Sequence, residues 1–129
     1  MSDDSLTAEA EEFVARAIES IQQVEVLLLL RGTSERWWTA AEIARELGVS
    51  ESTAAYDASA LRARGLFAKQ RETPPAYRYE PKNIQLLAGV ESIAAAYRDQ
   101  PLVVAKAISN RSERVLKTFA DAFVIRRRQ

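Results

Sequence analysis

The stretch from Thr39 to Gly65 most constrains the fold, because its sequence specifies two short helices with a tight turn between them. Thr39 followed by Glu42 is a capping box, in which two side chains satisfy free backbone amides at the start of a helix. Gly48 takes the chain out of this helix, and Ser50 is a suitable N-cap for a second helix that ends at Gly65. Apolar residues recur at helical spacing, so each helix is predicted to bury one face: Ala40, Ile43, Ala44 and Leu47 in the first, and Ala54, Ala58 and Leu61 in the second.

Two predicted strands follow the second helix. Residues 66–70 and 76–80 have the pattern of short strands, and Pro74-Pro75 between them cannot donate backbone hydrogen bonds. We therefore predict a β-hairpin over 66–80. Trp37 and Trp38, just before the first helix, are expected to form a short strand and to pack in the core and at the base of the hairpin.

Helical patterns flank this unit on both sides. The segment 7–31 is predicted to be one long helix, capped by Thr7 and ended by Gly32. The segment 83–125 is predicted to contain a helix over 84–98 after an Asn83 cap, one over 102–108 after Pro101, and a last one capped by Asn110 or Ser112. Their large apolar residues exceed what a small domain can cover, so we expect these helices to pack together as a dimerisation region: Phe13, Ile21, Leu87, Ile93, Phe119 and Phe123.

Composition limits the classes of function. The 129 residues (1–129) allow a single domain, with residues 20–82 as its core. The chain has no cysteine and no histidine, which excludes thiol chemistry and the usual zinc ligands and removes the commonest general base. Because no nucleophile–base pair, phosphate-binding glycine loop or metal-spaced cluster is visible, we expect no enzyme, no cofactor and no metal. The longest apolar run, 26–30, is too short for a membrane span, and the acidic N-terminus is unlike a signal peptide, so a cytoplasmic location is expected.

The net charge of zero conceals an uneven distribution. Residues 1–30 hold seven acidic residues and one arginine, residues 31–82 hold nine basic and seven acidic residues, and residues 83–129 hold eight basic and four acidic residues. The acidity is concentrated in the first helix, and the mildly basic remainder permits DNA binding without requiring it.

The order of helix, turn, helix and hairpin over residues 20–82 resembles the winged helix-turn-helix of bacterial regulators such as the MarR and PadR groups. The likeness rests on the capped helix and turn at 39–49, on Ser50-x-x-Thr53, on Gly65-Leu66, and on Tyr77-Arg78-Tyr79 with Pro81. It implies a mainly α-helical fold with a small β-hairpin, the wing (residues 66–80). It also implies a dimeric transcriptional repressor that places helix 51–64 in the major groove of double-stranded DNA and the wing on the backbone or in the minor groove.

The exposed side of the second helix and the wing supply the candidate DNA-binding residues. Hydroxyl groups can bond to bases or phosphates, and basic groups neutralise phosphate charge. We predict DNA contacts from Ser50, Ser52, Thr53, Tyr56, Ser59 and Arg62 on the helix and from Lys69, Arg71 and Arg78 in the wing. Arg64 is expected to touch phosphate rather than bases. Glu51 and Asp57 oppose this prediction, because a carboxylate repels phosphate unless it is turned aside.

A protein–protein interaction module without DNA binding would fit the same fold, since a fold does not fix a function. The neutral overall charge, the acidic first helix and the acids in the second helix of the pair favour this alternative. A continuous positive surface over residues 51–64 and the wing would favour DNA, whereas a mixed or apolar surface would favour a protein partner.

Overall fold

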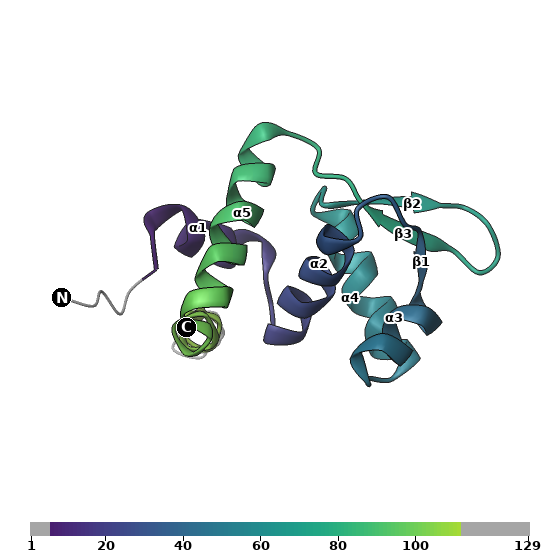
Figure 1. Cartoon of the computed structure of the whole chain (residues 1–129), viewed down its shortest axis with the longest axis horizontal. Coiled ribbons are helices and arrows are strands. Elements are labelled where there is room, and N and C mark those ends of the chain that lie inside the picture. Colours follow the sequence, from purple (N-terminus) through teal and green to yellow (C-terminus); the bar gives the residue numbers. More distant parts are fainter. Residues whose placement is uncertain (1–5, 112–129) are drawn as a thin grey trace, which may run out of the picture.

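The computed structural model describes residues 6–111, which are mainly helical with one small antiparallel sheet (Figure 1). In chain order the elements are α1 (Ala8–Ala17), α2 (Ile21–Gly32), β1 (Trp38–Thr39), α3 (Ala40–Leu47), α4 (Glu51–Ala63), β2 (Phe67–Gln70), β3 (Ala76–Tyr79) and α5 (Ile84–Asp99). Residues 101–111 are helical as well. This architecture agrees with the predicted fold class.

The prediction of one long helix over 7–31 is wrong, because the helix is interrupted between α1 and α2. α1 ends at Ala17, and Ile18 takes an extended conformation with its side chain fully buried. Ser20 then caps α2, and its hydroxyl accepts a hydrogen bond from the backbone N–H of Gln23 (3.1 Å). An N-cap serine stabilises a helix by about 1 kcal/mol, whereas inside a helix its side chain competes with the backbone bonds. The break allows α1 to pack on α5 while α2 packs on α4.

The predicted helix-turn-helix is confirmed together with its caps. Thr39 Oγ1 accepts from the backbone N–H of Glu42 (3.2 Å), and Glu42 Oε1 accepts from the backbone N–H of Thr39 (2.8 Å). Gly48 ends α3 with a φ of 70°, a left-handed conformation that favours glycine. The inner face of α4 is fully buried as predicted, through the small and apolar side chains of Ala54, Ala58 and Leu61. These contacts fix α4 against α2 and α3.

The wing belongs to a three-stranded antiparallel sheet with the order β1-β3-β2. The predicted hairpin is confirmed, and Phe67 of β2 pairs with Tyr79 of β3. The strand expected at Trp37 and Trp38 is found one residue further along, as β1, where Trp38 pairs with Tyr77. Trp38 is buried as expected. β1 therefore connects the base of the wing to the start of α3.

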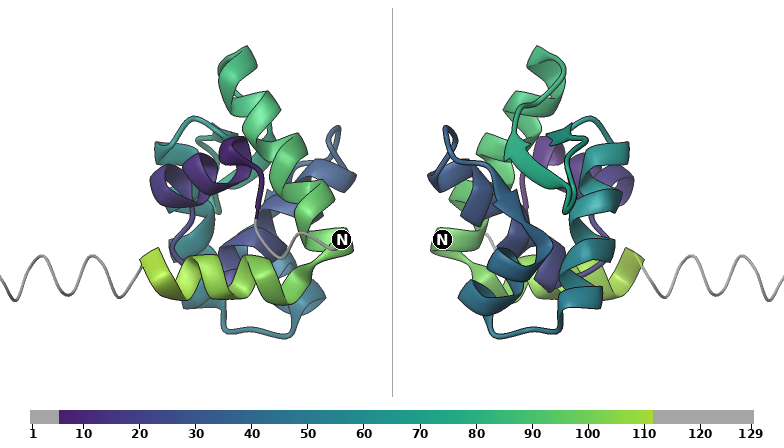
Figure 2. Two further views of the ribbon diagram at one scale, coloured as in Figure 1. Left: turned by 90° about the vertical axis from the view of Figure 1, so that its left-hand side faces the viewer. Right: turned by 90° about the vertical axis from the view of Figure 1, so that its right-hand side faces the viewer.

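α1 and α5 form a second layer beside the helix-turn-helix (Figure 2). They approach closely at Gly89, where an added Cβ would lie 2.5 Å from the ring of Phe13. Asn83 caps α5 as predicted, its side-chain oxygen accepting from the backbone N–H of Leu86 (2.8 Å). Leu87 was expected in the core but is 43% exposed, because the first turns of α5 project beyond the neighbouring elements (Figure 2).

The predicted helix over 102–108 is longer than expected. The helix that starts at Pro101 continues to residue 111, so a helix start at Asn110 is wrong. Val104 and Ile108 anchor this helix in the core. The alternative cap at Ser112 and the predicted core residues Phe119 and Phe123 lie outside the described residues.

Candidate nucleic-acid interface

α4 lies against α2, α3 and β2 with its inner face and leaves its outer face exposed. All the side chains predicted to contact DNA from this helix and its cap are exposed: Ser50, Ser52, Thr53, Tyr56, Ser59 and Arg62. The hairpin of β2 and β3 extends beside α4 (Figure 1). The predicted residues of α4 are thus exposed beside the hairpin, and Ser59 contacts Tyr77 of β3. Arg78, next to Tyr77 in the strand, lies on the opposite face of the sheet. Contact with DNA stays a prediction.

Three hydroxyls cluster at the start of α4. Ser50 Oγ accepts from the backbone N–H of Thr53 (3.1 Å), which confirms its role as the N-cap. The same oxygen lies 2.6 Å from the hydroxyl of Thr53 and 3.3 Å from that of Ser52. A helix N-terminus with exposed hydroxyls and free amides is chemically suited to an anion such as phosphate.

Two further hydroxyls of the outer face have partners in the protein. Tyr56, which is 59% exposed, donates its hydroxyl proton to Glu19 in the junction between α1 and α2 (2.9 Å). Ser59 lies within hydrogen-bond distance of the hydroxyl of Tyr77 in β3 (3.2 Å). These bonds orient the middle of α4 relative to the junction on one side and the wing on the other.

Asp57, which was expected to repel phosphate unless it is turned aside, points inward and is buried. Its two carboxylate oxygens accept hydrogen bonds from the side-chain amides of Gln23 (3.2 Å) and Gln22 (2.8 Å). Burial raises the pKa of the Asp57 carboxyl, and the two amide bonds act in the opposite direction. The objection that Asp57 would repel phosphate is therefore removed, whereas Glu51 stays exposed at the start of α4.

Arg64, expected to touch phosphate, is instead engaged within the protein. Its Nη2 donates to Oε1 of Glu19, and only 24% of its side chain is exposed. The hydrogen bond from Arg64 is the largest influence on Glu19 and lowers the pKa of its carboxyl. Glu19 therefore neutralises the cation at the end of α4, and Arg62 is the exposed cation of this helix.

The three predicted basic residues of the wing differ in their freedom. Lys69 and Arg71 are exposed, and the ammonium of Lys69 lies 6.0 Å from the ring centroid of Tyr77. Arg78 is half-buried, with its guanidinium 4.5 Å from the ring centroid of Trp37 and 3.3 Å from Glu80. Arg71 is thus the least constrained of the three, and the stacked Arg78 is the most fixed.

The exposed charges of α4 and the wing are mixed, with a small positive excess. The exposed cations are Arg62, Lys69 and Arg71, with Arg78 half-buried, and the exposed acids are Glu51, Glu72 and Glu80. The charges of this surface are therefore mixed rather than uniformly positive, which is the pattern that the sequence analysis associated with a protein partner.

Sequence reasoning missed Glu19, Gln22 and Gln23, because their partners on α4 are between 34 and 45 residues away along the chain. One local signal was available. Ser20-x-x-Gln23 is the spacing of a helix start, and it lies inside the segment 7–31 that the sequence analysis predicts as one helix. A helix start at that point would have placed Glu19 in a junction rather than on a helix face.

Within residues 6–111, no group of three or more acidic side chains is arranged to hold a metal ion. No helix in that range combines the length and the apolar character that crossing a membrane requires.

No family model matches the sequence, and no curated protein matches it either. Solved structures do resemble it. The homodimeric winged helix-turn-helix DNA-binding domain (fragment 1–100) of a possible ArsR-family transcriptional regulator from Mycobacterium bovis is 20% identical, with a TM-score of 0.51 over 70% of this chain and 81% of that chain. A mutant of Lactococcus lactis ZitR in its apo form is also 20% identical, with a TM-score of 0.46 over 82% of this chain and 81% of that chain.

The likeness to the Mycobacterium bovis domain establishes the class of fold. The chain has the winged helix-turn-helix fold, as the sequence predicted. At 20% identity the comparison shows the fold alone, and the resemblance to the MarR and PadR groups is not confirmed.

Proposed function

We propose that this protein is a DNA-binding transcriptional regulator that places α4 in the major groove and the wing on the backbone or in the minor groove. The observation that carries the proposal is the outer face of α4, which is exposed and lined with hydroxyls while the acid nearest its centre, Asp57, is turned inward. Such a helix beside a hairpin with a small excess of basic residues is suited to groove binding. The Mycobacterium bovis neighbour is described as a DNA-binding domain. The proposal does not depend on a particular regulator subfamily.

We assign the predicted contacts to two roles. The base edges are read by Ser52, Thr53, Tyr56 and Ser59. Phosphate is contacted from the two ends of α4, by Ser50 and Arg62. Lys69, Arg71 and Arg78 hold the wing on the DNA backbone. The division follows the position of each side chain, because recognition helices contact bases mainly through their N-terminal half and middle.

We further propose that the protein acts as a homodimer and as a repressor that occupies its site. Two large apolar side chains are strongly exposed: Ile84 at the start of α5 (83%) and Leu102 in the helix over 101–111 (84%), and Leu87 adds to the first of these areas. Covering them with a second copy removes apolar surface from water. A symmetric dimer would present two α4 helices about 34 Å apart, one turn of DNA. Sedimentation showing a monomer at micromolar concentration, with and without DNA, would refute this part. The proposal includes a cytoplasmic location and no catalytic activity.

Fluorescence anisotropy with duplexes selected from a randomised library tests DNA binding. Arg71→Ala and Lys69→Ala should weaken binding to every sequence and reduce its salt dependence by about one phosphate contact each. Ser52→Ala and Tyr56→Ala should change the preferred sequence instead. Arg16→Ala removes a charge from α1, where the side chain is 77% exposed, and serves as the matched control. Unchanged affinity and preference in all four variants would refute the proposal.

A protein-interaction module is the second candidate, and the mixed charge of the exposed face favours it. The wild-type protein separates the two candidates directly. A protein-interaction module should bind no duplex even at low salt, where the electrostatic contribution to DNA binding is greatest.

A further inference from the structure

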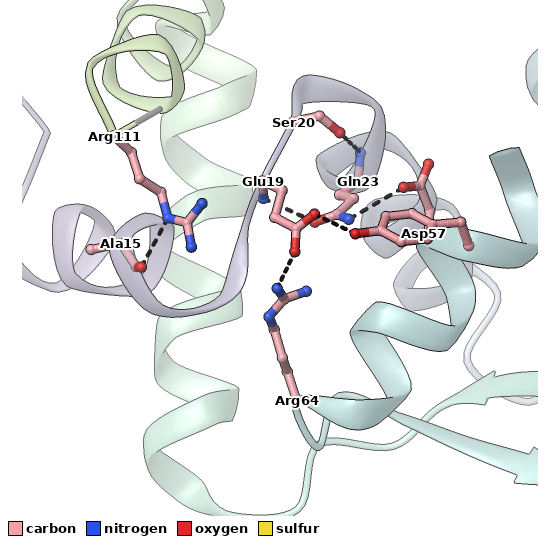
Figure 3. A network of polar contacts seen from close by, with 8 residues as sticks. Ala15, Glu19, Ser20, Gln23, Asp57, Arg64 and Arg111 are labelled. Carbon is pink, nitrogen blue, oxygen red and sulfur yellow. Dashed lines mark hydrogen bonds and ion pairs between the residues drawn. The ribbon is translucent and has the colours of Figure 1, made fainter. Parts of the chain in front are cut away.

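The junction between α1 and α2 contacts α4 through one carboxylate (Figure 3). Glu19 Oε2 accepts the hydroxyl proton of Tyr56 (2.9 Å), and Oε1 accepts from Nη2 of Arg64. Tyr56 and Arg64, the C-cap of α4, are eight residues apart, so one carboxylate binds two side chains whose backbone positions are about two turns apart. None of the contacts that we propose for the DNA explains why an acid should lie there.

The position of Glu19 is fixed from several sides. Ile18 is fully buried, the backbone N–H of Glu19 donates to Oε1 of Gln23 (2.9 Å), and Ser20 caps α2. The guanidinium of Arg111 donates to the carbonyl of Ala15 (2.9 Å), which holds the last turn of α1 (Figure 3). The carboxylate is therefore placed by the backbone before any ligand binds.

The ionisation of Glu19 and Tyr56 determines which of the two side chains donates the hydrogen bond. The hydrogen bond from Arg64 lowers the pKa of Glu19, so at neutral pH the carboxylate is ionised and can only accept. The bond to Glu19 also raises the pKa of Tyr56, which keeps the phenol protonated. The single hydroxyl proton of Tyr56 therefore points to Glu19, and its oxygen is left with lone pairs alone for an outside partner.

We propose that Glu19 is a positioning residue that makes the Tyr56 hydroxyl a hydrogen-bond acceptor and so directs it to an amino group on a base. This inference rests on the proposed DNA binding. In the major groove the amino groups of adenine and cytosine are donors, whereas guanine N7 and O6 and thymine O4 are acceptors. Phosphate oxygens are acceptors too, so the contact is selective for a base edge over the backbone. Because the Tyr56 side chain is already held in one orientation, binding does not incur the entropic cost of immobilising it, which is an effect of about two- to tenfold in affinity.

The variant Glu19→Gln should reverse this polarity. Arg64 can only donate, so it retains the single oxygen of the glutamine amide, and the amide nitrogen then faces Tyr56. That nitrogen donates to the tyrosine oxygen and frees the hydroxyl proton. Tyr56 would then act as a donor towards DNA and favour a carbonyl or ring nitrogen.

The experiment has two steps. Selection from randomised duplexes with the wild type and with Tyr56→Phe identifies the base pair whose preference depends on the hydroxyl. Synthetic duplexes then lack either the amino group at that pair, through purine in place of adenine or 2-pyrimidinone in place of cytosine, or the carbonyl of the partner base. Removing the amino group should weaken wild-type binding by at least about fivefold and leave Tyr56→Phe unchanged. Glu19→Gln should lose this sensitivity and become sensitive to loss of the carbonyl.

Glu25→Gln is the matched control, since it removes the same charge from an exposed position on α2 and should behave as the wild type. Thermal melting of each variant shows that binding is measured on folded protein. The inference is overturned if Glu19→Gln keeps the amino-group dependence, if the wild type depends on the carbonyl instead, or if Tyr56→Phe alters no position. A wild type that selects no sequence would refute the proposed function itself, and the two failures are therefore distinguishable.

Discussion

The two faces of α4 are built on different principles. On the inner face Ala54, Ala58 and Leu61 are fully buried, and the one charged residue there, Asp57, has an amide partner for each oxygen. On the outer face the side chains are exposed, and their hydroxyls bond to one another or to single groups on neighbouring elements. Packing thus fixes where the helix lies, while a few polar contacts fix how it presents its surface. Stability and recognition can therefore be altered separately within one helix.

Leu61→Ala tests the inner face and should have the largest effect. The side chain is fully buried, and its truncation should lower the free energy of unfolding by about 2–5 kcal/mol through lost burial and a cavity. Urea unfolding followed by circular dichroism measures the change. Arg62→Ala, one residue further along on the exposed side, is the control and should leave the midpoint nearly unchanged. A loss below 1 kcal/mol for Leu61→Ala would show that the inner face does not anchor the helix.

Ser50→Ala tests a residue that both caps α4 and is proposed to contact phosphate. Its hydroxyl caps α4, so removal should lower the free energy of unfolding by about 1 kcal/mol. Ser50→Asp sharpens the comparison, because aspartate also caps a helix but adds a negative charge where phosphate is proposed to bind. Its stability should match the wild type while its DNA affinity falls. An aspartate variant that binds DNA as tightly as the wild type would exclude a phosphate at this site.

The inner and outer faces also differ in how far the sequence predicts them. The bounds of α3 and α4 were predicted to within one residue, and Ile43, Ala44, Ala54, Ala58 and Leu61 are buried as predicted, because caps, glycines and helical periodicity are local signals. Ala40 and Leu47, also predicted on the buried face of α3, are half-buried. The inward orientation of Asp57 was not predicted, because it depends on Gln22 and Gln23, which are 35 and 34 residues earlier in the sequence. For the same reason Arg64 was assigned to phosphate when its partner is Glu19. The predicted DNA contacts themselves depend on a partner molecule, which neither periodicity nor capping can reveal.

Acid titration tests the contact between the junction and α4. Because Arg64 lowers the pKa of Glu19 below its ordinary value of 4.5, the pair stabilises fully above that value and loses its effect as the pH falls through the lowered pKa. Asp57 acts oppositely: burial raises its pKa above 3.8, so its charge costs stability as the pH rises through the raised pKa. Glu19→Gln should therefore reduce stability at neutral pH by up to about 1 kcal/mol and flatten its loss in acid. Urea unfolding from neutral pH down to about pH 3 measures both the stability at neutral pH and its loss in acid. An acid slope identical to that of the wild type would show that the pair does not contribute.

Ser52→Ala should have the smallest effect on folding and is the sharpest test of the comparison. The hydroxyl is exposed, and its only bond shown in the structure is a 3.3 Å contact to the Ser50 side chain, which keeps its own capping bond. The free energy of unfolding should therefore stay within about 0.5 kcal/mol of the wild type. If the outer face is a recognition surface, the same change alters the preferred DNA sequence in anisotropy measurements. A variant that loses more than 1 kcal/mol of stability would mean that the outer face also supports the fold, and the separation of the two faces would then fail.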